Sequence, residues 1–241
     1  MKYAETKEDL TATAGLGPIL DLFLYNPLYP EFCRSLPKRV SNASYDTEVF
    51  GLILLAGFFI GFDCLDDLEH FQSNLLIIER FGLVPTPKAF GDWLRGFEEE
   101  DLLRLKEFVR HHAQFARKQI NSEAPLILDM DSTSHVQHGK KMEGLEYDYK
   151  GNWCLSSLLA SDEMGFSHAL ELRSGGAFSS IGAPEMIGEV FSHLKYGVEK
   201  YFRADSAFCN QECLEECVRM GAKFTMPTRC SHRLTCKVLR S

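Results

Sequence analysis

The chain has 241 residues, of which 45% are hydrophobic and 25% are charged, as in an ordinary globular protein with a buried core. Its formal net charge of −8 argues against a simple basic nucleic-acid-binding protein, but not against an enzyme that grips DNA through a local patch. The amino terminus lacks the pattern of a secretory signal, and the longest apolar run, residues 49–62, is shorter than the roughly 20 residues that span a bilayer. Eight irregularly spaced cysteines favour reduced thiols in a cytosol.

The first 120 residues are predicted to form an all-helical domain. Helices are expected over residues 16–24, 46–61, 66–81, 88–97 and 98–120, with turns at Asn26-Pro27 and Tyr29-Pro30. The segment 46–61 is apolar on almost every side, which predicts the core helix of this domain. The last helix carries a polar face that we expect to be solvated, consisting of Arg110, His111, His112, Arg117 and Lys118.

Residues 121–241 show a different pattern, after an expected linker at 121–124. Strands are predicted over residues 126–133, 153–161, 166–173, 201–206 and 222–226, and helices over 184–200 and 210–220. The second and third strands could form a hairpin across residues 162–165. Strands followed by helix–strand–helix–strand predict an α/β layer with a mixed sheet. Three cysteines on one face of the second helix, Cys209, Cys213 and Cys217, are expected to be core thiols rather than zinc ligands.

The stretch Leu126-Ile-Leu-Asp-Met-Asp-Ser-Thr133 is the first candidate for chemistry. Its apolar start predicts a short buried strand, and Asp129 and Asp131 lie two residues apart, so their side chains point to the same side. Carboxylates at the end of an apolar strand are costly unless a cation or a reaction requires them. Three interpretations stay open on these residues: an ordinary turn, a divalent-metal site for phosphoryl chemistry, and an aspartyl-phosphate nucleophile.

Asp205 is the second candidate, at the end of the strand 201–206 and directly before a turn into a helix. Ligands in α/β folds gather at the carboxyl ends of strands, so Asp205 and Asp131 could face each other if their strands are neighbours. Two such carboxylates suit Mg²⁺, which binds hard oxygen ligands. An Asp-Ser pair at a helix start is, however, more often an amino-terminal cap.

Several motifs in order resemble the insertion-sequence transposases of bacteria that belong to the DDE group. They are Asp131-Ser-Thr, His138-Gly-Lys-Lys-Met-Glu-Gly144, Leu172-Arg-Ser-Gly-Gly-Ala-Phe-Ser-Ser-Ile-Gly-Ala183 and Arg203-Ala-Asp-Ser-Ala-Phe208. The resemblance covers residues 126–226, and the amino-terminal helices also resemble those of the family. It implies an α/β fold in which an all-helical amino-terminal domain (1–120, a candidate for binding DNA ends) precedes an incomplete RNase H-like mixed-sheet core (121–241).

The same resemblance implies a function and a site. The family cuts phosphodiester bonds by metal-dependent hydrolysis and then transfers the DNA strand. Asp131 and Asp205 would be the two aspartates that hold Mg²⁺, with Mn²⁺ as an alternative, and Asp129 would be a neighbouring partner or itself the first ligand. The implied partner is double-stranded DNA, both transposon ends and target, with a homodimer as the candidate assembly and no membrane. The implied location is the bacterial cytoplasm, with nucleoid association when DNA is bound.

The sequence departs from the family pattern in three places. Asp92 stands where the family has a basic residue, and Gly176 stands where it commonly has Asn. The family's catalytic glutamate lies on a helix well beyond the second aspartate, whereas no acidic residue follows Glu216 here. The expectation from sequence is therefore a truncated chain with an incomplete metal site that does not transpose DNA.

Two alternative functions remain open from sequence. Asp129-Met-Asp131-Ser-Thr133 also fits the Asp-x-Asp-x-Thr signature of haloacid-dehalogenase-like phosphatases, in which Asp129 would be the nucleophile and Asp131 the general acid and base. The acidic pair that such enzymes carry on a later strand is missing, because Asp205 has no second carboxylate before Glu212. The other alternative is a non-catalytic, DNA-binding or inhibitory remnant of a transposase.

Overall fold

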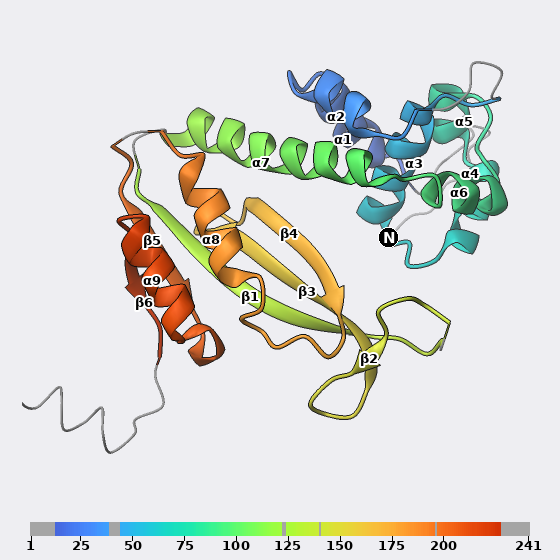
Figure 1. Ribbon diagram of the computed structural model, residues 1–241. Coiled ribbons are helices and arrows are strands. Elements are labelled where there is room, and N and C mark those ends of the chain that lie inside the picture. Colours follow the sequence, from blue (N-terminus) through green and yellow to red (C-terminus); the bar gives the residue numbers. More distant parts are fainter. Residues whose placement is uncertain (1–12, 39–43, 122–123, 140, 196, 228–241) are drawn as a thin grey trace, which may run out of the picture. The chain divides into compact units, whose positions relative to one another are not determined.

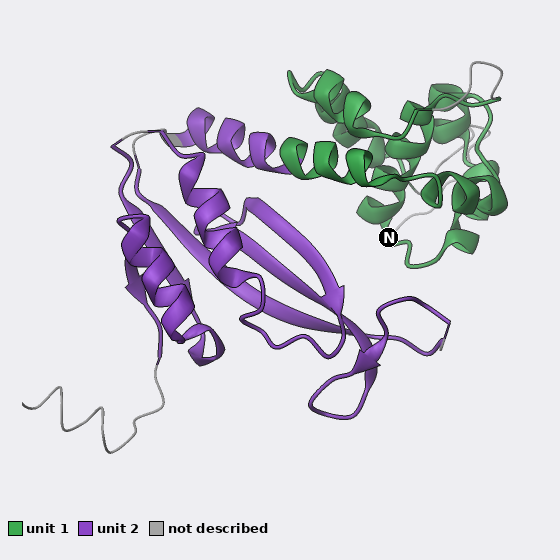
Figure 2. Ribbon diagram, viewed as in Figure 1, with its two compact units in different colours: residues 1–108 green, residues 109–241 purple. Residues whose placement is uncertain are grey.

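The computed structural model describes residues 13–38, 44–121, 124–139, 141–195 and 197–227. The chain divides into two compact units, residues 1–108 and 109–241, coloured separately in Figure 2. The long helix α7 (Glu99–Asn121) begins in the first unit and ends in the second. The two units divide within this helix, at residues 108 and 109, whereas the domain boundary predicted after residue 120 lies at its end and stays a prediction.

The described part of the first unit is helical. Its helices, in chain order, are α1 (Leu16–Leu24), α2 (Tyr29–Ser35), α3 (Thr47–Ile60), the 3₁₀ helix η1 (Leu65–Leu68), α4 (Glu69–Gln72), α5 (Leu75–Phe81), α6 (Pro87–Leu94) and the start of α7 (Figure 1). The apolar helix predicted over residues 46–61 is confirmed as α3, and its Phe50 is fully buried. The Phe50 ring stacks on Trp93 of α6 with 5.2 Å between ring centroids.

Two predictions in this unit are wrong. The single helix expected over residues 66–81 is divided into η1, α4 and α5, because Asn74 begins a new helix by accepting a hydrogen bond from the Ile77 N–H. Residues 29–35 form α2 rather than a turn. Pro30 is compatible with that helix because it lies in the first turn, where its missing N–H has no partner to lose.

None of the described helices is long and apolar enough to cross a membrane by itself. Helix α3 and the segment Leu65–Gln72 meet the length and composition requirements only when they are taken together, and the chain bends by 103° at the break between them.

In its described residues, the second unit combines a six-stranded sheet with helices. Its elements after α7 are β1 (Leu126–Val136), β2 (Glu146–Tyr147), β3 (Trp153–Asp162), β4 (Ser167–Ser174), α8 (Ala183–Ser192), β5 (Lys200–Ala204), η2 (Ser206–Phe208), α9 (Gln211–Arg219) and β6 (Lys223–Thr225). Strand β1 pairs antiparallel with β3, which in turn pairs antiparallel with β2 and β4. On its other side β1 pairs parallel with β5, and β5 pairs parallel with β6. This mixed sheet confirms the predicted α/β fold class.

One face of the sheet carries the core of the second unit. Every second residue of β1 from Leu126 to Met130 is buried, together with Phe202 of β5. Helices α8 and α9 contribute Ile187, Phe191, Cys213 and Cys217 to the same cluster. The prediction of core thiols is thereby confirmed for Cys213 and Cys217, whereas Cys209 is only partly buried. Because side chains alternate along a strand, Asp129 and Asp131 belong to the opposite face of β1.

The helix predicted over residues 184–200 is wrong in its second half. Helix α8 ends at Ser192, and β5 begins at Lys200. Gly197 between them has a φ of 90°, which is outside the right-handed helical region. The shorter helix leaves room for β5 to start early enough to pair with β1 from its first residues.

Candidate active site

The pairing of β1 with β5 brings the two predicted aspartates side by side. The two strands are parallel, and their register runs from Leu126 opposite Lys200 to Met130 opposite Ala204. Asp131, in the middle of β1, and Asp205, directly after the last residue of β5, follow this last pair in the chain. The two strands are therefore neighbours, and each aspartate lies one residue beyond the paired stretch.

The two carboxylates differ in their surroundings. Asp131 is exposed, and no other described residue forms a hydrogen bond or ion pair with its carboxylate. Asp205 is also exposed, and its Oδ1 accepts a hydrogen bond of 2.8 Å from the Ala207 N–H at the start of η2. Asp205 is thus an amino-terminal cap, as its sequence context suggested. The cap uses one carboxylate oxygen and fixes the orientation of the other.

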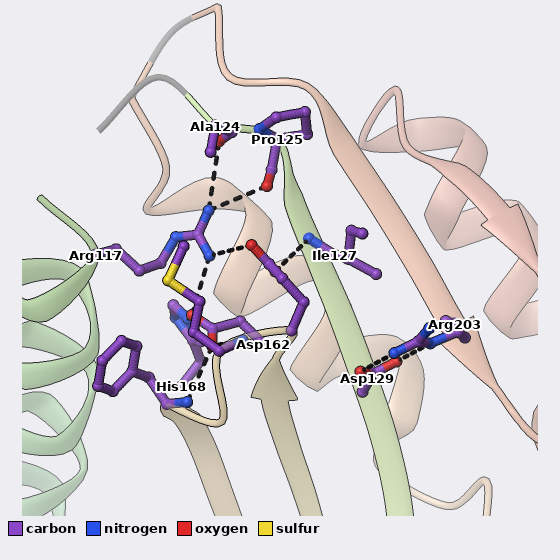
Figure 3. A network of polar contacts seen from close by, with 11 residues as sticks. Arg117, Ala124, Pro125, Ile127, Asp129, Asp162, His168 and Arg203 are labelled. Carbon is purple, nitrogen blue, oxygen red and sulfur yellow. Dashed lines mark hydrogen bonds and ion pairs between the residues drawn. The ribbon is translucent and has the colours of Figure 1, made fainter. Parts of the chain in front are cut away.

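Asp129 is engaged by a partner that the sequence did not reveal. Arg203 lies opposite Asp129 in the strand register and donates two hydrogen bonds to it, 2.5 Å from Nε to Oδ1 and 2.6 Å from Nη2 to Oδ2 (Figure 3). Both oxygens of Asp129 are therefore occupied by a charge-assisted fork. Asp131 and Asp205 are the pair that this geometry leaves available.

The available oxygens fit a hard divalent cation. Carboxylate oxygens are the ligands that Mg²⁺ and Mn²⁺ prefer, and such sites commonly use one or two carboxylates together with water and substrate phosphates. In the part of the chain that the structure describes, one group offers three potential ligands close together, Asp63, Cys64 and Asp67 in the first unit, with ligand atoms within 4.8 Å of one another. That group is separate in sequence and fold from the two strand-end aspartates.

Comparison with protein families shows to which family this chain belongs. The family model described as "Transposase DDE domain group 1" matches residues 37–240, which is most of the chain. The chain belongs to this family. The match spans both units and includes Asp131 and Asp205.

Solved structures with similar folds include other transposases. The piggyBac transposase synaptic complex with hairpin DNA aligns over 93% of this chain and 53% of its own, with 14% identity and a TM-score of 0.45. The Mos1 transposase paired-end complex with left transposon end aligns over 79% of this chain and 69% of its own, with 11% identity and a TM-score of 0.30. This DDE-family chain thus spans about half the length of the piggyBac chain. Among curated proteins, none matches it significantly.

The phosphatase alternative is not supported. A carboxylate that acts as a nucleophile must be able to reach its substrate, whereas both oxygens of Asp129 are bonded to Arg203. The family match over residues 37–240 also favours the transposase interpretation.

A buried polar network supports the DDE-family core from its helix-covered face. Arg117 of α7 is only 7% exposed and donates to Asp162 of β3 and to Glu163, at 3.1 and 2.9 Å (Figure 3). His168 of β4 lies 3.0 Å from the same Asp162 oxygen. The prediction that Arg117 belongs to a solvated helix face is wrong, because its charge is neutralised by carboxylates more than 40 residues away in the sequence.

The pKa values in this network have clear directions. Burial lowers the pKa of His168 below its ordinary value of 6.5, so the ring is neutral and donates from Nε2 to Asp162. Burial alone would favour the neutral acid at Asp162. Hydrogen bonds from His168, Phe166 N–H and Arg117 outweigh that effect and hold the pKa of Asp162 below 3.8.

We expect this core to lose stability on mild acidification. The unfolded state takes up a proton on His168 near pH 6.5 and the folded state does not, so stability is complete above pH 6.5 and falls below it. The free energy of unfolding should drop more between pH 7.5 and 5.5 than it does in a His168→Gln variant. Urea unfolding measures this difference through Trp153 fluorescence in a Trp93→Phe background. Equal pH dependence in both proteins would refute it.

Arg173 forms hydrogen bonds that hold together the motif at residues 172–183 and the two strands beside it. Its guanidinium is buried and donates to the hydroxyls of Ser132 and Ser156 at 2.8 and 3.0 Å. It also donates to the carbonyl oxygens of Ser179 and Ile181 in the segment that leads into α8. One side chain therefore ties β1, β3 and this segment together, directly behind the strand position of Asp131.

Gly175 is required by a close approach of two backbone segments. A Cβ at this position would lie 2.0 Å from the Cys154 carbonyl oxygen and 2.6 Å from that of Glu146. We expect Gly175→Ala to lower the free energy of unfolding by at least about 2 kcal/mol, because backbone atoms cannot move aside as a flexible side chain can. Gly139→Ala is the matched control, since nothing lies within 4 Å of its added Cβ. Urea unfolding of both variants tests the expectation, and equal stability would contradict it.

Proposed function

We propose that this chain carries the cation-binding aspartates of a DDE transposase and takes part in metal-dependent cleavage and transfer of DNA strands. The observation that carries the proposal is the family match over residues 37–240, and the parallel pairing of β1 with β5 up to Met130 and Ala204, the residues directly before Asp131 and Asp205, supports it. Neither feature would suffice alone, because strand-end aspartates often serve only as caps.

The chain's residues have distinct parts in the proposed chemistry. A bound Mg²⁺ or Mn²⁺ would activate the attacking oxygen and stabilise the leaving oxygen of a phosphodiester. Asp131 would bind the cation with a carboxylate that has no competing partner among the described residues. Asp205 would bind with the oxygen that its cap leaves available. Positioning and charge neutralisation by these side chains would account for most of the rate enhancement.

The proposed substrate is double-stranded DNA, both the transposon ends and the target. Among the similar solved structures, the piggyBac transposase is in complex with hairpin DNA and the Mos1 transposase with a left transposon end. Because the net charge of this chain is −8, binding would depend on a local basic surface and fall with rising salt. A homodimer and a location on the nucleoid in a bacterial cytoplasm complete the proposal.

A third carboxylate belongs to the family's metal site, and no acidic residue follows Glu216 in these 241 residues. We therefore propose that residues 1–241 alone bind a cation and DNA but do not transfer strands. Robust Mg²⁺-dependent strand transfer by the purified chain would refute this part.

A combined experiment tests the function. The full chain is titrated with Mn²⁺ by electron paramagnetic resonance, and with the terminal repeats of its element in a gel shift at several salt concentrations. The proposal expects binding of both. DNA binding without cation binding would instead identify a non-catalytic DNA-binding remnant, and binding of neither would exclude both functions.

A further inference from the structure

Four charged residues occupy neighbouring positions on β1 and at the carboxyl end of β5. Asp129 lies opposite Arg203 in the register, and Asp131 and Asp205 occupy the next position beyond the last recorded pair on each strand. Residues two apart on a strand point to the same face, so all four belong to one face. The group combines three carboxylates with one guanidinium.

The position of Arg203 makes it a potential competitor for the cation. Diagonal neighbours on a sheet are separated by about 7–8 Å, a distance that long side chains can bridge. Asp131 is such a neighbour of Arg203, and Asp205 follows Arg203 by two residues, directly after the end of β5. In the structure, however, the guanidinium is turned to Asp129, with bonds of 2.5 and 2.6 Å (Figure 3).

We propose that Asp129 is a positioning residue that holds Arg203 away from the cation-binding carboxylates. In return, Arg203 occupies both oxygens of Asp129 and keeps that carboxylate from drawing the cation out of place. This inference rests on the proposed function, because it requires Asp131 and Asp205 to be the ligands. It explains why a third strand aspartate can lie beside the site without joining it.

A purely structural role for the pair makes a different prediction. The side chains of Arg203 and Asp129 are 59% and 31% exposed, and exposed ion pairs contribute little to stability. A pair that only joined two strands would act on the cation through its charge alone, which across about 7–8 Å of solvent at physiological salt changes the affinity about twofold in either single variant. The positioning role predicts a much larger loss of affinity in Asp129→Asn, because the released guanidinium takes up a ligand oxygen.

The test measures Mn²⁺ affinity of the full chain by electron paramagnetic resonance. All proteins carry Asp63→Asn, which removes one member of the separate ligand group in the first unit. We expect Asp129→Asn to weaken binding at least tenfold, because the released Arg203 turns to Asp131 or Asp205. Arg203→Gln should bind as tightly as the parent or more tightly, and the double variant should return to within about threefold of the parent.

The possible outcomes are decisive. A loss of about twofold or less in Asp129→Asn, weaker binding in Arg203→Gln, or no recovery in the double variant would each overturn the positioning role. Asp131→Asn is measured beside them: if it does not weaken binding, the metal site of the proposed function fails as well. If it weakens binding and Asp129→Asn does not, only the positioning role fails. Thermal unfolding followed through tryptophan fluorescence confirms that each variant is folded.

Discussion

Replacing Asp131 or Asp205 by asparagine is expected to weaken Mn²⁺ binding on the order of a hundredfold. Asparagine keeps the size and one acceptor oxygen of aspartate but removes the negative charge. Loss of one unit charge next to a divalent cation near a protein surface costs about 3 kcal/mol, which corresponds to roughly that change in dissociation constant. The fold should survive, since Asp131 has no described partner to lose and asparagine caps helices as well as aspartate does.

Two controls make this result specific. Both variants are compared in the Asp63→Asn background, so that the ligand group of the first unit does not contribute. Asp148→Asn provides a matched substitution, because Asp148 also accepts backbone hydrogen bonds in a turn but lies outside the site. Affinities that do not differ between the site variants and Asp148→Asn would show that the strand-end aspartates do not bind the cation.

Strand patterns in the sequence predicted the positions of the two candidate aspartates, but not their contacts. The alternation of Leu126, Leu128 and Met130 with polar residues indicates which face Asp131 occupies, and the motif around Asp205 places it at a strand end. The ion pair of Asp129 could not be foreseen from sequence. It depends on Arg203, which is 74 residues away and becomes a neighbour only through the parallel register.

In the fold as well, features that depend on nearby residues were predictable from sequence, and features that depend on distant residues were not. Helix α3 was predictable because a run of apolar residues ends at Gly61, whose φ of 84° closes the helix. The role of Arg117 was not, because an arginine on a polar helix face usually lies in water. Its burial depends on Asp162 and Glu163 in the turn between two strands, which no local pattern connects to α7.

Asp162→Ala is expected to lower the free energy of unfolding of the second unit by about 3–5 kcal/mol. The carboxylate is buried and accepts hydrogen bonds from Arg117, His168 and the backbone N–H groups of Met164 and Phe166, at 2.9–3.1 Å. Alanine would leave these donors without their acceptor in a site that water does not reach. The largest part of the cost is that the buried guanidinium of Arg117 loses one of the two carboxylates that neutralise its charge.

The measurement is urea unfolding at pH 7.5, followed through Trp153 in a Trp93→Phe background so that fluorescence reports on the second unit alone. Asp148→Ala is the matched control, because it also accepts two backbone hydrogen bonds, both of 2.9 Å, but at a solvent-accessible turn. We expect that control to cost about 1 kcal/mol. A loss in Asp162→Ala no larger than in the control would mean that Arg117 and His168 find other partners. Contacts other than this network would then hold α7 against the sheet.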